Sequence, residues 1–332
     1  MTEGATVLLT GASGFIGSAV ARSLVEEGFA VRALVRPGSR RDHLTGLGVD
    51  VVEGSINAAA SVNAALASRR YLVHVAADYR LWARDVREIF AANVEGTRVV
   101  MEEARKAGVE RVVYTSSVAT VQPRPDGTPA DESAFMSEGA ASGAYQRSKI
   151  MAERLVRDMI ADGLPAVIVN PATVIGPNDV RPTPTGRIII AAATGRIPAF
   201  VDTGLNLVHV DDVARGHVAA LRRGRIGERY ILGGDNVRFA RMLADIAALA
   251  GRRPPRLRIP WYAALPVAFV AETASRVSGH EPLATLEGVR HARDRMFFST
   301  AKAEQQLGIR ARPYQEALAD ALAWFRGAGY LR

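Results

Sequence analysis

The 332-residue chain contains no cysteine, which excludes disulfide bonds and metal sites built on thiolates. Its six histidines are scattered, and none lies four residues before another, so we expect no metal site. A run of about 18 apolar residues, which an ordinary membrane-spanning helix needs, is also absent. The first residues lack a basic segment followed by a long apolar run. We therefore expect no signal peptide and a cytoplasmic location.

Lysine is scarce: only Lys106, Lys149 and Lys302 occur among 42 basic residues, and the formal net charge is +8. Basic surfaces attract anionic partners, although a general preference for arginine explains the composition more simply. The arginine clusters lack the interleaved aromatic side chains on which single-stranded nucleic acids stack. We expect no nucleic-acid partner.

A glycine-rich stretch runs from Thr10 to Gly17, between an apolar strand pattern and a helical pattern. In a strand–turn–helix of this kind, the first glycine permits the turn, the second lets the backbone approach a pyrophosphate, and the third packs the helix against the sheet. The helix N-terminus adds unpaired N–H groups and a positive dipole end. We expect a dinucleotide here, in contact with Gly11, Ser13, Gly14, Phe15, Ile16 and Gly17.

Strand and helix patterns alternate along the first half of the chain, which predicts a parallel sheet with helices on both faces, a doubly wound Rossmann α/β fold. After residue 171, proline and glycine become frequent and strands become short. We predict a Rossmann domain over 1–178 and 207–234, and a smaller α/β substrate-binding lobe over 179–206 and 235–332. The expected strands are 6–9, 30–35, 49–52, 71–77, 111–117 and 165–170, and the expected long helices are 16–25, 86–104 and 143–162.

The most apolar stretch runs from Ile259 to Ala271. With about 13 residues it is too short to span a bilayer. We expect a core helix here. An apolar wall of the substrate site and contact with a membrane surface are the alternatives.

The end of the second strand carries Arg36, and no acidic residue follows before Asp42. An acidic side chain at this place would bind the ribose of NAD, whereas arginine accommodates the additional phosphate of NADP. Arg40 and Arg41 add positive charge close by. We predict a preference for NADP(H), with NAD(H) as the alternative. The alternative is that Arg36 is simply one more arginine of an arginine-rich chain and has no role in the choice of cofactor.

Tyr145 and Lys149 lie four residues apart and therefore share a face of the predicted helix. A phenol ionises near pH 10, and a neighbouring ammonium lowers this value. The pair can then exchange a proton with a hydroxyl or carbonyl oxygen while a hydride moves to or from a nicotinamide. Ser116 and Ser117 end the fifth strand and offer a hydroxyl to the same oxygen.

Together these motifs resemble those of the extended short-chain dehydrogenases/reductases, which include NAD-dependent epimerases and dehydratases. The matching stretches are 10–17, 74–77, 93–97, 115–117, 145–149 and 170–177. By this resemblance Ser117 is the catalytic hydroxyl, Tyr145 is the acid/base, and Lys149 lowers the pKa of Tyr145 and holds the nicotinamide ribose. The resemblance also implies cofactor contacts from Val75, Ala76, Ala77, Thr115, Tyr145, Lys149, Pro171, Ala172 and Val174.

Two further features follow from the family pattern. Asn93 and Thr97 fit positions that support the site, although both can equally satisfy the backbone. The family often has an aspartate after the third strand to contact adenine, whereas this chain has Ser55 and Ile56 there. We expect these two residues to take the adenine contact. The helices at 86–104 and 143–162 pair in the resembling family as a dimer interface, which implies a homodimer.

Within the family, Arg36 resembles dihydroflavonol reductase relatives, and the stretches 74–82, 182–188 and 201–212 resemble hopanoid-associated sugar epimerases. We expect an NADP(H)-dependent oxidoreductase that interconverts a carbonyl and a hydroxyl. Epimerisation of a nucleotide sugar with bound NAD(P) is the alternative. A dinucleotide sensor without chemistry is disfavoured, since such a protein typically lacks the tyrosine–lysine pair.

Contacts with the small-molecule substrate are expected from loops at the carboxyl ends of the strands and from the smaller lobe. For each candidate a purely structural role remains open. The candidates are Tyr79, Arg80, Trp82, Thr120, Arg187, Asn206 and His209.

Overall fold

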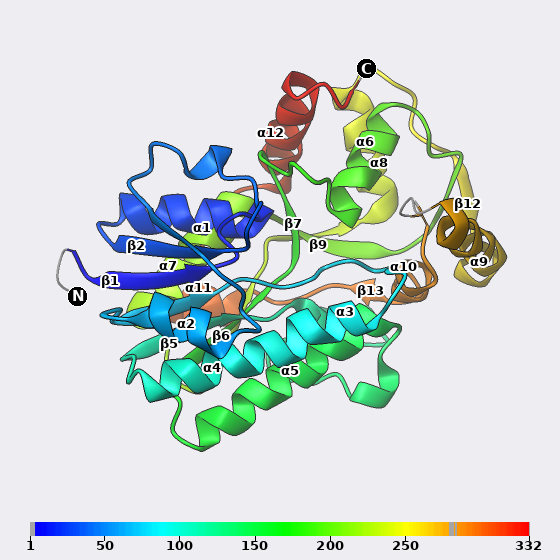
Figure 1. The fold of residues 1–332 in the computed structure, drawn as a ribbon. Helices are drawn as coiled ribbons and strands as arrows, with labels where there is room; N and C mark the ends of the chain where they lie inside the picture. Colours follow the sequence, from blue (N-terminus) through cyan, green and yellow to red (C-terminus); the bar gives the residue numbers. More distant parts are fainter. Residues whose placement is uncertain (1–3, 279–281, 283, 332) are drawn as a thin grey trace.

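The main body of the computed structural model, which describes residues 4–278, 282 and 284–331, is a seven-stranded parallel sheet (Figure 1). The strand order is β3-β2-β1-β4-β5-β6-β10, so the order reverses between β1 and β4. This confirms the predicted doubly wound Rossmann fold. The strands are β1 (Thr6–Thr10), β2 (Ala30–Val35), β3 (Asp50–Glu53), β4 (Tyr71–His74), β5 (Arg111–Thr115), β6 (Ala166–Pro171) and β10 (Arg229–Leu232).

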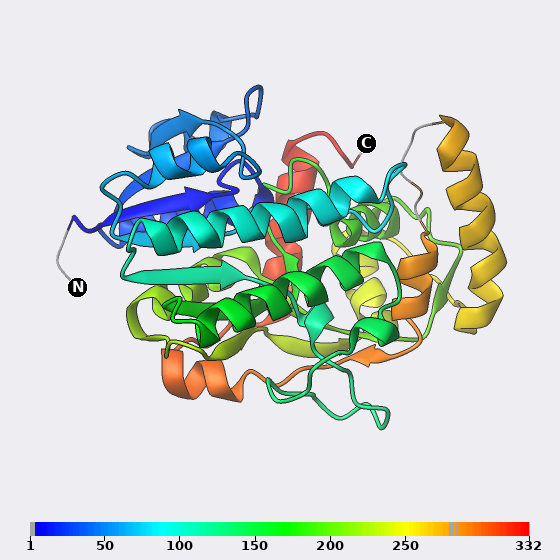
Figure 2. The same ribbon diagram turned by 60° about the horizontal axis from the view of Figure 1, so that its bottom comes forward.

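Each face of this sheet has its own apolar core, because alternate residues of a strand point to opposite faces. On β1, Val7 and Leu9 pack into one core and Leu8 into the other. The first core lies under α1 (Phe15–Glu26), α7 (Val210–Arg223) and α11 (Ala301–Leu307). The second lies under α2 (Ala59–Leu66), α4 (Gly96–Lys106) and α5 (Ala144–Ala161). Figure 2 shows α4 and α5 side by side across the second face.

A second, four-stranded sheet forms the smaller lobe around its central strand β9 (Gly204–His209). β9 pairs with β7 (Thr173–Ile175), β11 (Asp235–Arg238) and β13 (Arg295–Met296). A shared core joins it to α6 (Pro184–Ala193), α8 (Phe239–Leu249) and α12 (Tyr314–Gly327). The lobe is completed by β8 (Ala199–Val201), β12 (Leu257–Ile259), α9 (Trp261–Ser278) and α10 (Leu286–His291).

The division between the two bodies differs from the predicted boundaries. β7 belongs to the smaller sheet, although 173–178 was expected in the Rossmann domain. Conversely, α11 lies inside the predicted lobe segment 235–332 but packs on the Rossmann core through Ala303 and Leu307. An apolar pattern shows that a helix is buried without showing which body it packs against.

The helix expected over 86–104 is not one regular helix. It consists of α3 (Arg87–Phe90), a π-helical turn over Ala91–Glu95, and α4. A π turn inserts one extra residue into the helical repeat and frequently marks a functional site. The strands β4 and β5 also end earlier than expected, at His74 and Thr115, because the chain beyond them turns into loops.

The apolar stretch over 259–271 forms most of α9, but not as a core helix. Tyr262, Val267, Phe269 and Val270 are each more than 60% exposed, whereas Ala264 and Ala268 are buried. The expectation of a core helix is therefore wrong for these four exposed side chains, whereas Trp261 and Leu265 are half-buried. Among the described helices, none is both long and apolar enough to cross a membrane.

Candidate active site

The glycine turn joins β1 to α1 at the carboxyl end of the sheet. Gly11 has φ +77°, and a side-chain carbon there would lie 2.6 Å from the backbone nitrogen of Ala76. A side-chain carbon at Gly17 would collide with the carbonyl oxygen of Gly11. Gly14 precedes α1 and offers no side-chain cap, so the first N–H groups of the helix face outward. This cradle fits a pyrophosphate, and the contacts of Ser13, Phe15 and Ile16 with the cofactor stay predictions.

Arg36 follows β2 and is exposed beside this turn. Its two neighbours are already paired: Arg40 with Asp42 at 2.8 Å, and Arg41 with Glu53. The Arg36 side chain makes no hydrogen bond or ion pair within the described part of the chain, which leaves its guanidinium available to a phosphate. His43, which sequence reasoning missed, contacts the carbonyl oxygen of Ala12 in the glycine turn through Nε2 at 3.2 Å.

The segment after β4 passes directly beside the glycine turn. The backbone N–H of Ala76 donates to the hydroxyl of Thr10, and the same hydroxyl contacts His74 Nδ1 at 2.7 Å. Burial lowers the pKa of His74 to about 3, so the imidazole is neutral and serves this network. Val75 and Ala77 flank Ala76 and are partly exposed or exposed. Their predicted contact with the cofactor is compatible with this position.

Two predicted adenine contacts, Ser55 and Ile56, follow β3. The Ser55 hydroxyl accepts the N–H of Asn57 at 3.2 Å. The Ile56 side chain packs on Gly96 at the start of α4. Both residues are half-buried, and their contact with a cofactor stays a prediction.

The reactive group of residues is formed by the end of β5 and the first turns of α5. The Ser117 hydroxyl lies close enough to the phenol of Tyr145 to lower its pKa. Lys149, one helical turn after Tyr145, is only 3% exposed and donates from Nζ to the Thr115 carbonyl oxygen at 2.9 Å. The structure therefore brings the three predicted catalytic residues together at the carboxyl edge of the sheet.

The protonation of this group is governed mainly by burial. Burial raises the pKa of Tyr145, the nearby Ser117 hydroxyl lowers it, and the charges of Glu287 and Asp78 raise it further. Burial also lowers the pKa of Lys149 to about 8, against the opposing effect of Glu153. The lowered phenol pKa that the sequence predicted is thus not found: a buried phenol is costly to ionise, and the acidic groups nearest to it oppose ionisation.

Ser117, to which the family resemblance assigned the catalytic hydroxyl, and its neighbour Ser116 have different partners. Ser116 is buried and donates to Glu153 Oε2 at 2.5 Å. Ser117 is partly exposed, and its hydroxyl also accepts the N–H of Ala119. The predicted catalytic role therefore fits Ser117 alone.

Glu153 is a buried acid behind the reactive group that sequence reasoning missed. Its Oε2 accepts hydrogen bonds from Ser116, from the Thr120 hydroxyl at 2.7 Å and from Asn170 Nδ2 at 2.8 Å. Its Oε1 accepts one from Arg229 Nη1 at 2.8 Å. The available signal was spacing, since Glu153 continues the helix face of Tyr145 and Lys149 at four-residue steps.

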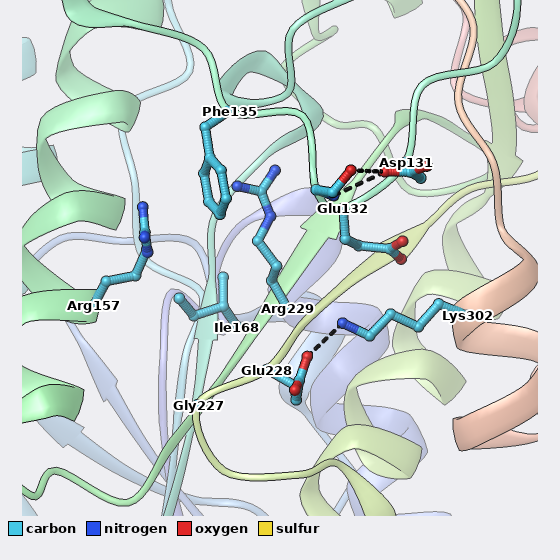
Figure 3. Close-up of a pocket in the computed structure, with 10 residues that line it drawn as sticks. Asp131, Glu132, Phe135, Arg157, Ile168, Gly227, Glu228, Arg229 and Lys302 are labelled. Carbon is cyan, nitrogen blue, oxygen red and sulfur yellow. Dashed lines mark hydrogen bonds and ion pairs between the residues drawn. The ribbon is translucent and has the colours of Figure 1, made fainter.

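Arg229 extends this network to a separate cavity of about 560 Å³ at the outer edge of the sheet. Figure 3 shows its guanidinium beside the ring of Phe135, and the guanidiniums of Arg229 and Arg157 lie 4.3 and 4.1 Å from that ring's centre. Lys302, also on the wall, pairs with Glu228 at 2.6 Å. None of the reactive residues lines this cavity, so it is distinct from the candidate active site.

The π-helical turn has a visible consequence at the site. It places the buried Asn93 so that Oδ1 accepts the N–H of Asp78 at 2.7 Å, while Nδ2 donates to the Asp78 carbonyl and to the Ser148 hydroxyl. Asn93 thereby ties the loop after β4 to α5. Thr97 supports the same region by contacting His74 Nε2 at 3.2 Å.

Several predicted site residues instead serve the fold. Thr120 is buried against Glu153, and the Thr115 hydroxyl contacts His217 Nε2 at 2.9 Å, while the cofactor contact of Thr115 stays a prediction. Asn206 is 1% exposed and binds the backbone of Gly234 and Phe298. The substrate contacts expected of Thr120 and Asn206 are therefore wrong, because internal partners occupy their polar atoms.

The substrate contact expected of His209 is a third prediction that the structure corrects. It is 1% exposed, accepts the N–H of Asp211 at the start of α7, and contacts Asp320 at 3.2 Å. It caps a helix and joins it to α12, and a substrate does not reach it.

The remaining substrate candidates lie on the loop after β4 and on α6. Arg80 is paired with Asp78 and Glu88, and the Tyr79 hydroxyl donates to the Arg181 carbonyl oxygen at 3.3 Å. Trp82 in the same loop and Arg187 on α6 are half-buried. Pro171, Ala172 and Val174 connect the two sheets at the end of β6, where a cofactor contact stays a prediction.

Glu287 on α10 is a further residue that sequence reasoning missed. Its carboxylate accepts the backbone N–H groups of Tyr145 at 3.3 Å and Gln146 at 2.9 Å, at the N-terminus of α5. Burial raises its pKa to about 7, and the two backbone hydrogen bonds act in the opposite direction. The C-terminal part of the chain thus reaches the reactive residues.

Known proteins agree with this geometry. A family model described as the NAD dependent epimerase/dehydratase family matches residues 7–233. A Synechocystis protein that carries the provisional name dihydroflavonol 4-reductase is 41% identical over 98% of this chain and 95% of its own length. A Methylococcus capsulatus protein named sterol demethylase protein B is 34% identical over 98% of this chain and 100% of its own. The crystal structure of gox2253 has a TM-score of 0.89 at 46% identity and covers 99% of both chains.

The family model spans the glycine turn, the reactive residues and β10, and the relatives extend over nearly the whole chain. The protein belongs to the NAD dependent epimerase/dehydratase family and is an enzyme of nicotinamide-dinucleotide chemistry.

Proposed function

We propose that this enzyme is an NADP(H)-dependent oxidoreductase that interconverts a carbonyl and a hydroxyl group. The closeness of the Ser117 and Tyr145 hydroxyls, with Lys149 one helical turn away, carries the proposal. Two hydroxyls at one point offer a substrate oxygen both a hydrogen bond and a proton. The cofactor, when bound, supplies or accepts the hydride.

The raised pKa of Tyr145 suits the direction of reduction. A phenol that stays protonated at neutral pH can donate its proton to the oxygen of a carbonyl, and Ser117 can hold that oxygen in place. Lys149, buried and bonded to the Thr115 carbonyl, fixes the helix face that carries the phenol. Contact of Lys149 with the nicotinamide ribose is part of the proposal.

Selection of NADP(H) rests on Arg36. Its exposed guanidinium lies after β2, where a dinucleotide in the cradle of Gly11 to Gly17 would present the adenosine ribose. Arg40 and Arg41 are engaged by acidic side chains. The preference for NADP(H) therefore depends on one arginine in this proposal.

The test is consumption of NADPH by the purified protein with a panel of aldehydes and ketones. Loss of nicotinamide absorbance that depends on the added carbonyl compound supports the proposal. The family description also covers epimerases, so nucleotide-sugar epimerisation is the second candidate. Stoichiometric NAD⁺ that survives dialysis, with no net consumption of NADPH, would favour epimerisation and contradict the reductase.

Two structural parts of the proposal concern the surroundings of the site. Tyr79, Trp82 and Arg187 are proposed substrate contacts, since they lie on the loop after β4 and on α6 of the smaller lobe. A homodimer through α4 and α5, which lie together on one face, is proposed as well (Figure 2). Sedimentation velocity measures that assembly directly.

A further inference from the structure

The helix α9 presents its larger apolar side chains to solvent. Tyr262, Val267, Phe269 and Val270 are 64%, 63%, 61% and 66% exposed. At about 100° per residue, these positions spread over roughly half of the helix circumference, and together they form one broad exposed face, the apolar stripe. Figures 1 and 2 both show α9 at the outer edge of the smaller lobe.

The opposite face of α9 is held to the protein by Ala264 and Ala268, which are buried with Val289 of α10, and by the half-buried Leu265. An amphipathic helix of a globular protein normally turns most of its large apolar residues inward, whereas four of those in α9 face solvent. A contiguous exposed apolar patch of this kind marks an interaction site.

The segment that leads into α9 is strongly basic. Between residues 251 and 271 there are four arginines and no acidic residue. Arg252, Arg253, Arg256 and Arg258 are all exposed, and Leu257 among them is 60% exposed. The first acid, Glu272, accepts the N–H of Leu286 at 2.7 Å and so faces α10.

We propose that α9 and the segment 252–258 form a docking site for an anionic lipid membrane surface, to which the protein binds peripherally. The apolar stripe would enter the boundary between headgroups and acyl chains, and the arginines would contact anionic headgroups. A second copy of this chain fits the same surface less well, because a symmetric pair would bring two arginine segments to one interface. The acid beside the segment, Asp202, already lies 3.7 Å from both Arg258 and Arg238.

The docking site lies close to the reactive residues. α9 packs on α10, and Glu287 of α10 accepts the N–H groups of Tyr145 and Gln146. In addition, Arg84 Nη2, from the loop after β4, donates to the Arg276 carbonyl oxygen at 3.1 Å. Docking through α9 would thus hold α10 and the first turn of α5, which carries Tyr145, near the membrane surface.

The test is co-sedimentation of the full-length protein with vesicles of phosphatidylcholine alone and of phosphatidylcholine with phosphatidylglycerol. We expect the protein to bind the anionic vesicles and to lose that binding by roughly tenfold or more in V267D/F269D. The control I226D adds one negative charge at an exposed isoleucine away from α9, and the single variant V267D is its partner of equal charge. This control should bind as the unmodified protein does, and unchanged thermal unfolding of all variants shows that they are folded.

The second arm replaces Arg253 and Arg256 by glutamine, which should weaken binding to anionic vesicles and reduce its dependence on salt. The proposal is overturned if the unmodified protein binds neither vesicle, or if V267D/F269D binds as well as I226D. A further outcome also overturns it: the unmodified protein does not bind vesicles, and sedimentation velocity shows that V267D/F269D converts a dimer into a monomer. The stripe is then a self-association surface.

Discussion

Glu153 and Arg229 form an ion pair of 2.8 Å between side chains that are only 3% and 6% exposed. The pair lies behind Ser116, which donates to the same carboxylate. Removing one member of a buried pair leaves an uncompensated charge, which costs about 3–5 kcal/mol. We expect Arg229→Met to lower the free energy of unfolding by about that amount in a urea titration.

A control for this prediction is Arg241→Met. Arg241 pairs with Asp245, and the Arg241 side chain is 68% exposed. An exposed pair contributes about 0–1 kcal/mol. The double variant Glu153→Gln with Arg229→Met should recover part of the loss, since neither charge is then left alone. Equal effects of Arg229→Met and Arg241→Met would contradict the burial of the first pair.

Tyr145→Phe removes the phenolic proton and retains the ring. We expect turnover to fall by about 10²- to 10⁴-fold, the usual contribution of a positioned acid or base. Initial rates with NADPH and the substrate found in the carbonyl panel measure the effect. Tyr262→Phe, on the exposed stripe of α9, is the control and should keep its turnover; a Tyr145→Phe enzyme that remains as active would rule out the assigned proton donor.

Arg36→Ala tests the cofactor preference. A hydrogen bond to a charged group contributes about 1.5–3 kcal/mol, so the apparent affinity for NADP(H) should fall roughly 10- to 100-fold. Affinity for NAD(H), which lacks the additional phosphate, should change little. Arg40→Ala is the matched control because Arg40 already pairs with Asp42. Parallel losses for both cofactors would show that Arg36 does not read the phosphate.

Glu287 makes stability depend on pH. Its pKa is raised to about 7 in the folded protein, from an ordinary value of 4.5. Between these values the unfolded chain releases the proton and the folded protein keeps it, so stability is fully present below about pH 4.5 and declines as pH rises through 7. The contribution is on the order of 3 kcal/mol.

Glu287→Gln should remove this component of the slope when the free energy of unfolding is measured at several pH values. The amide retains an oxygen that can accept the N–H groups of Tyr145 and Gln146. If the variant and the parent show the same slope from pH 4.5 to 7, the carboxyl of Glu287 is not the group responsible.

The sequence predicted the Rossmann half of the molecule well, because its signals are local. The turn from Gly11 to Gly17 needs glycine for reasons that lie within a few residues of it. Each β-strand there is an apolar run of a few residues that ends at a turn. The pair Tyr145 and Lys149 likewise needed only the repeat of one helix to be recognised.

Distant hydrogen bonds explain the wrong site predictions. Asn206 binds Asn236 and Phe298, and His209 contacts Asp320, more than a hundred residues away. A polar residue after a strand is equally consistent with a ligand contact and with such an internal partner. Only the tertiary structure shows which partner is present.

The prediction of a core helix over 259–271 was wrong for a different reason. Its composition is apolar on nearly every side, so the pattern identifies a helix without showing which face is buried. The inward face is set by Ala264 and Ala268, which permit a close approach to α10. The orientation of α9 is therefore set by which of its side chains fit against α10, and hydrophobicity alone does not predict it.

The path of the chain between its two sheets limits how the protein can be divided. The chain leaves the Rossmann sheet after β6, returns after β9, leaves again after β10, and returns at α11 before ending in α12. No single cut therefore separates a nucleotide-binding fragment from a substrate-binding one. Anyone who exchanges the smaller lobe between relatives must graft three discontinuous segments together, with every junction placed beside the site where the two bodies meet.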